Sequence, residues 1–138
     1  MGPMAEDQMS TDADWLLKAM VVIAAADGRL DTREVGLIQQ VYEKQTGRRL
    51  TAVDIAKAAQ ANAEDDVLAQ FAAASAVLDD PIKEEIIRSA YLVLLADNRI
   101  SGEERKKLKD IAMALKIQEI HFGTILENLA LSLQGRKD

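Results

Sequence analysis

The sequence predicts a single all-α domain of about seven helices, and three observations support this prediction. Hydrophobic residues make up 49% of the 138 residues, whereas aromatic residues make up only 4%. This composition favours helices that pack through small aliphatic side chains. Apolar residues recur at helical intervals, and no segment alternates as a β-strand does. A motif also occurs twice, at residues 26–34 and 96–104, and each copy predicts two helices joined by a tight turn.

The N-terminal part is expected to be a tail followed by a buried helix. Residues 1–11 are polar and unpatterned, which predicts a flexible tail, and Met1-Gly2-Pro3-Met4 resembles a cloning remnant before a second methionine. The helical domain is expected to span residues 12–133. Its first helix runs from Trp15 to Ala26 and is almost continuously apolar, as a central buried helix would be.

Turn and cap residues delimit the next three helices. Gly28 suits a helix stop, and Asp31-Thr32-Arg33-Glu34 has the spacing of a capping box that starts the second helix. Thr46-Gly47 ends that helix, and Thr51-Ala52-Val53-Asp54 begins the third. The acidic residues 64–66 mark the start of the fourth helix, where the helix dipole favours anions. In this fourth helix the residues expected to face inward are Leu68, Phe71, Ala72 and Ala76.

The last three helices follow from similar signals. In Asp79-Asp80-Pro81, Asp80 is expected to cap the fifth helix and Pro81 to take its first position. That helix is predicted to run to Ala96. Ser101-Gly102-Glu103-Glu104 forms a second capping box for the sixth helix, and a seventh begins at about Gln118. Residues 134–138 are charged and are expected to form a flexible tail.

Each copy of the repeated motif contains what we call an acidic corner. The first acidic corner comprises Asp27, Asp31 and Glu34, and the second offers Asp97, Asn98, Ser101, Glu103 and Glu104. Three interpretations stay open at this point. The acids cap helices and turns, or they bind a divalent cation, or the two corners form one face that binds basic groups of a partner protein.

The cation interpretation depends on the chemistry of the side chains. Carboxylates with loop carbonyls are the ligands that Ca²⁺ and Mg²⁺ prefer, and the turn can bring both helix ends together. The second corner has Ser101 where the first has Asp31, so its site is expected to be weaker. The pattern is not an EF-hand, because a loop starting at Asp27 would have Arg29 at its third position and Ile38 at its twelfth.

Composition excludes several classes of function. The net charge of −6 disfavours binding to nucleic acid and to anionic membrane surfaces. No cysteine is present, which excludes thiolate catalysis and is compatible with the cytoplasm. His121 is the only histidine, so no Ser-His-Asp arrangement is credible, and we expect it on a helix surface. No apolar run is long enough to insert into a membrane.

At these motifs the sequence resembles the TerB family, named for a tellurite-resistance protein. The resemblance rests on residues 26–34, on Leu78-Asp79-Asp80-Pro81 and on residues 96–104 with the downstream segment 111–117, and it covers most of residues 13–133. A similar domain occurs in a membrane-anchored DnaJ-like co-chaperone. Asn98 departs from the family, which usually has Gly there, although Asn also tolerates a left-handed backbone.

The resemblance implies a seven-helix fold with pseudo-repeated halves. It also implies an acidic cluster that binds metal ions and a role in tellurite resistance or stress response, often beside membrane-associated partners. The matching positions are Asp27, Glu34, Asp97 and Glu104, and Asp31 joins them because acids are frequent there. We therefore expect a non-enzymatic, cytoplasmic binding or scaffold module that takes Ca²⁺ or another divalent cation. The alternative is a metal-assisted hydrolase that uses the same carboxylates.

Overall fold

A computed structural model describes residues 2–26, 30–64, 66–97 and 102–135, with the side chains of residues 12–26, 30–64, 66–96 and 102–133. These residues form seven helices and no strand, which confirms the predicted all-α class. In chain order the helices are α1 (Gly2–Ala24), α2 (Thr32–Thr46), α3 (Ala52–Glu64), α4 (Val67–Ala74), α5 (Asp80–Asp97), α6 (Gly102–Ala114) and α7 (Glu119–Gly135).

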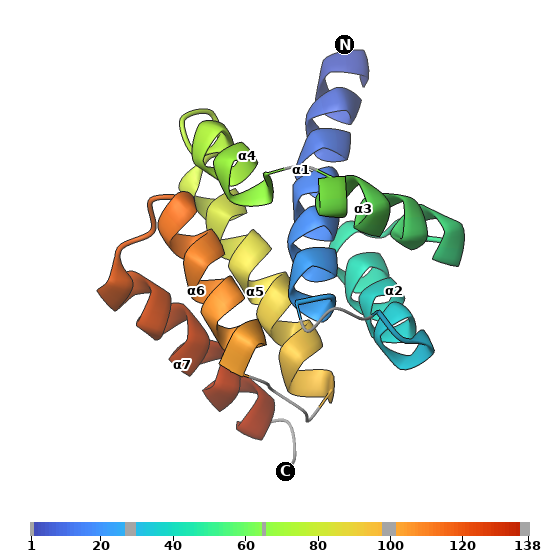
Figure 1. The fold of residues 1–138 in the computed structure, drawn as a ribbon. Helices are drawn as coiled ribbons and strands as arrows, with labels where there is room; N and C mark the ends of the chain where they lie inside the picture. The colour runs from blue at the N-terminus through green and yellow to red at the C-terminus, as the bar shows by residue number, and fades with distance from the viewer. Residues whose placement is uncertain (1, 27–29, 65, 98–101, 136–138) are drawn as a thin grey trace.

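The helices pack around a central pair, α1 and α5, which lie against each other. Helices α2 and α6 each contact both members of this pair, whereas α3 packs mainly on α1 and α7 mainly on α5. Helix α4 lies between α3 and α5 in the chain and packs on α6. In Figure 1, α1 and α5 run in the same direction, so both end at the lower side of the molecule, where α2 and α6 begin. The described parts of the two motif copies, at the start of α2 and at the start of α6, therefore lie at the same end of the fold.

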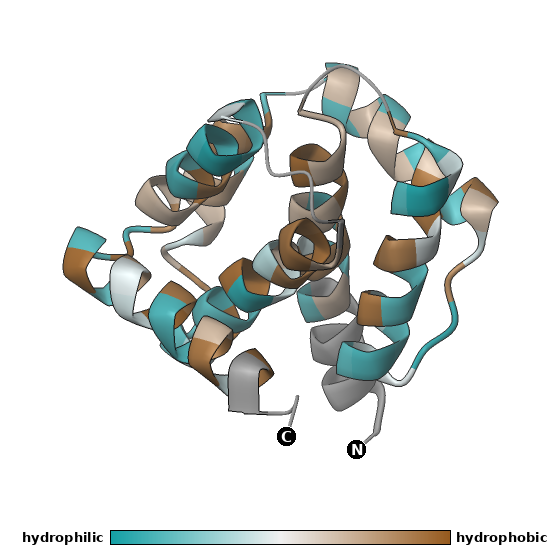
Figure 2. Cartoon of the chain, turned by 90° about the horizontal axis from the view of Figure 1, so that it is seen from below, coloured by the Kyte–Doolittle hydropathy of each residue, from teal (hydrophilic) through white to brown (hydrophobic). Residues whose placement is uncertain are grey.

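Residues that lie seventy positions apart in the two copies of the repeat are buried alike. Leu16, Ala19 and Ile23 of α1 are buried, and so are their counterparts Ile86, Ser89 and Val93 of α5. In the following helices, the buried Ile38 and Tyr42 of α2 correspond to the buried Leu108 and Ala112 of α6. Hydrophobic and hydrophilic residues are mixed along most helices in Figure 2, as expected where one face of each helix is buried. The repeat in the sequence is thus a repeat in packing.

Ser89 is the polar member of one repeated pair. Its side chain is fully buried at the position equivalent to Ala19, and its hydroxyl has no hydrogen-bond partner among the described residues. A buried hydroxyl without a partner costs free energy. We predict that Ser89→Ala raises the free energy of unfolding by about 1 kcal/mol. A urea titration measures this difference.

Ser75 provides the matched control for this prediction. Its hydroxyl donates a hydrogen bond to the carbonyl oxygen of Ala72 at 2.8 Å. Ser75→Ala removes that bond and should not stabilise the protein. If Ser89→Ala instead lowered the free energy of unfolding as much as Ser75→Ala, the hydroxyl of Ser89 would have a partner in solution.

The start of the first helix differs from the prediction. It was expected at Trp15, but α1 begins at Gly2 and so includes most of the expected tail. Residues 4–24 contain neither Gly nor Pro, so nothing interrupts the helix upstream of the apolar segment. Pro3 is tolerated because the first turn of a helix needs no donor there. At the other end α7 continues to Gly135, so the expected tail 134–138 is helical in its first two residues, and 136–138 lie outside the described residues.

Two further local predictions are corrected. Ala76 was expected to face inward, but α4 ends at Ala74 and Ala76 is exposed, while the following Leu78 is buried. Asp80 was expected to cap α5, but it is the first residue of that helix. The carbonyl of Asp79 accepts hydrogen bonds from the amides of Ile82 and Lys83, so the cap position lies one residue earlier. Pro81 still falls in the first turn, where its missing amide proton is harmless.

A backbone motif and an ion pair stabilise the turn between α6 and α7. Lys116 has a positive φ of 66°, and the amides of Lys116 and Ile117 donate to the carbonyls of Met113 and Ala112, which closes α6 with a Schellman motif. Across this turn, Lys109 Nζ lies 2.8 Å from Glu119 Oε1. The hydrogen bond between them lowers the pKa of Glu119 below its ordinary value of 4.5 and raises the pKa of Lys109 above 10.5.

This ion pair predicts a pH-dependent contribution to stability. Because the native pKa of Glu119 is lowered, the contribution is present above pH 4.5 and is lost as the pH falls through the native pKa. The raised pKa of Lys109 means that the contribution also disappears above pH 10.5, as the pH rises through that native pKa. Glu119→Gln should therefore lower the urea midpoint slightly at about pH 7 and leave it unchanged at about pH 3. An equal decrease at both pH values would contradict this assignment.

Candidate functional site

The first acidic corner lies between the end of α1 and the start of α2. Asp31 is the N-cap of α2, with an extended backbone at φ −88° and ψ 172°. Asp31 Oδ1 accepts a hydrogen bond from the Glu34 amide at 2.8 Å, and Glu34 Oε1 accepts one from the Asp31 amide at 3.1 Å. The predicted capping box is confirmed, so capping is one role of both carboxylates. Asp27 lies outside the described residues.

The capping box at the start of α3 provides a comparison for the one formed by Asp31 and Glu34. The hydroxyl of Thr51 and the carboxylate of Asp54 exchange hydrogen bonds with each other's amides, both at 3.1 Å, at the start of α3. The backbone hydrogen bond from Thr51 lowers the pKa of Asp54. Asp54 is exposed, whereas the side chain of Glu34 is only 6% exposed. Burial of the Glu34 carboxylate is thus not a consequence of the capping box itself.

The second acidic corner repeats the buried glutamate. Glu104 is the third residue of α6, as Glu34 is of α2, and its side chain is 4% exposed. Asp97 is the last residue of α5, at the same end of the molecule, and its side chain lies outside the described residues. Ser101 also lies outside them. The structure therefore brings Glu34 and Glu104 into equivalent, buried positions at the starts of two helices.

The described residues do not by themselves form a metal-binding cluster. Within them, no three acidic or histidine side chains are placed to hold an ion. Of the five predicted ligands, Asp31, Glu34 and Glu104 are described with their side chains, and Asp27 and the Asp97 side chain are not. The divalent-cation site stays a prediction.

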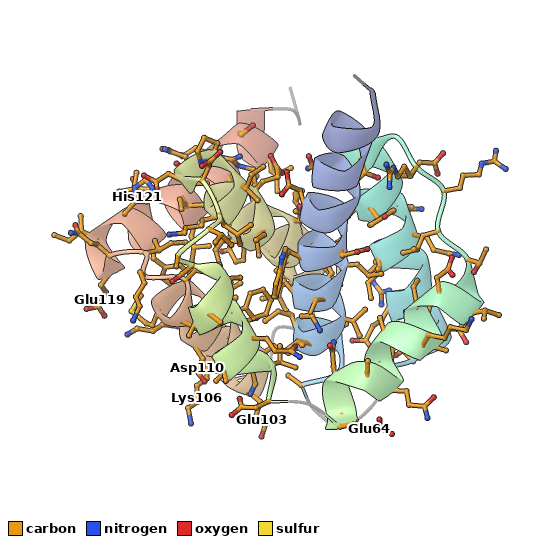
Figure 3. The ribbon with its side chains drawn as sticks, turned by 90° about the horizontal axis from the view of Figure 1, so that it is seen from above. Glu64, Glu103, Lys106, Asp110, Glu119 and His121 are labelled. Atoms are coloured by element: carbon orange, nitrogen blue, oxygen red, sulfur yellow. The ribbon has the colours of Figure 1, made fainter. Side chains whose placement is uncertain are left out.

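His121 lies on the surface, as predicted, and away from the corners. It is about half exposed on α7, and its Nε2 atom lies 3.4 Å from Glu84 Oε2 of α5. Figure 3 shows His121 on the opposite side of the α6–α7 pair from Glu103, the residue that precedes Glu104. The histidine therefore does not join the buried glutamates in one site.

A groove that the sequence did not reveal opens beside the end of α1. It has a volume of about 420 Å³ and is bounded by α1, α3, α4 and α6. Most of its lining is aliphatic, with two charged side chains and one amide: Val21, Val22, Ala25, Ala26, Ala59, Asn62, Ala63, Asp66, Val67, Leu68 and Lys107. Four separate segments contribute, so no local motif could have indicated it. Ala25 and Ala26 lead directly into the first corner.

Comparisons with known proteins found no relative of this chain. The chain matches no protein-family model, no curated protein and no solved structure. None of the described helices is both long and apolar enough to cross a membrane. The resemblance to the TerB family therefore stays a prediction that rests on the repeated motif and its spacing.

Proposed function

We propose that this protein is a TerB-like, non-enzymatic binding module whose acidic corners take a divalent cation such as Ca²⁺. The proposal places the protein in a cytoplasmic tellurite-resistance or stress-response system, beside a protein partner that is membrane-associated. This biological context comes from the sequence resemblance alone. The cation-binding part has support from the geometry of the corners.

The observation that carries the proposal is the pair of buried glutamates. Glu34 and Glu104 occupy the same position of α2 and α6, at the same end of the molecule, and are 6% and 4% exposed. Each of the two carboxylates has an interaction within the chain, and Glu34 Oε1 accepts a hydrogen bond from the Asp31 amide. A carboxylate can accept several bonds, so a cation can share these oxygens with the donors of the chain. Carboxylate oxygens are the ligands that Ca²⁺ and Mg²⁺ prefer, and each copy of the motif holds one at this position.

Catalysis is not part of the proposal because the sequence offers few groups for it. The chain has no cysteine and one histidine, and that histidine pairs with Glu84 away from the corners. A metal-assisted hydrolase would need a general base or nucleophile close to the ion. Binding of an ion by carboxylates needs neither.

Calorimetric titration with Ca²⁺ tests the proposal. The wild type should bind with a saturable heat, and Glu34→Gln combined with Glu104→Gln should weaken binding at least about tenfold, because two ligand charges are lost. Glutamine at this position still completes a capping box, so the fold should persist. Glu127→Gln changes an exposed glutamate of α7 and should bind as the wild type does. Equal binding by all three proteins would overturn the proposal.

A further inference from the structure

We draw no further inference here: the strongest candidate, the mainly aliphatic groove beside the end of α1, is lined by one carboxylate and one lysine, and nothing among the described residues shows what covers it.

Discussion

Phe71→Ala is expected to lower the free energy of unfolding by about 3–5 kcal/mol, the largest effect of any single change considered. Phe71 of α4 is fully buried, and its ring centroid lies 5.2 Å from that of Trp15 on α1. The two rings are tilted by 49°, an arrangement that adds to the burial of apolar surface. Helix α4 is only eight residues long, so it has few side chains that can contact α1. The contact between Phe71 and Trp15 is therefore a main attachment of α4 to α1.

Urea unfolding followed by the fluorescence of Trp15, the only tryptophan, measures this loss. Phe71→Leu keeps most of the apolar volume and should lose less than about 1.5 kcal/mol. A loss as small for alanine as for leucine would show that α4 is held mainly by other contacts.

Asp31→Ala is expected to lower the free energy of unfolding by about 1 kcal/mol, and by up to about 2 kcal/mol, because the N-cap of α2 loses its acceptor. The lost bond is the one from the Glu34 amide to Asp31 Oδ1 at 2.8 Å. Asp31→Asn should be close to the wild type, since asparagine is an equally good N-cap. Thermal and urea unfolding of the three proteins give the comparison.

The same pair of variants separates the two roles of Asp31. If Asp31 also binds a cation, Asp31→Asn should reduce the stabilisation by Ca²⁺ while leaving stability without the ion unchanged. If Asp31→Asn destabilised the ion-free protein as much as Asp31→Ala, the charge itself would matter for folding and the capping account would be wrong. Thr51→Ala, in the exposed box of α3, serves as the control for the loss of a cap without any proposed ion.

The helices were predictable where the sequence contains local signals. Capping boxes at Asp31 and Thr51 and the left-handed Gly47 each form as the residue types indicate, because caps depend on interactions over a few residues. The start of α1 was missed because residues 1–11 have no apolar period, although they also contain no breaker after Pro3. A helix can extend from a buried segment without a pattern of its own.

The functional features were harder to predict, for a physical reason. An aspartate and a glutamate three residues apart serve a capping box and a cation site equally well, so the sequence alone leaves both roles open. Burial of Glu34 and Glu104 distinguishes them from the exposed Asp54, and burial depends on packing between distant helices. The groove depends on alanines just after α1 and on α3, which carry no signal of their own.

The most direct test of the cation-binding proposal is a Ca²⁺ titration of the ¹⁵N-labelled protein, read from its amide shifts. If the acidic corners bind the ion, the shifts should be saturable, largest at the amides around Glu34 and Glu104, and absent from the variant that combines Glu34→Gln with Glu104→Gln. Shifts spread evenly over the exposed acids, or no shifts at about millimolar Ca²⁺, would contradict it. The acidic corners would then be helix caps alone.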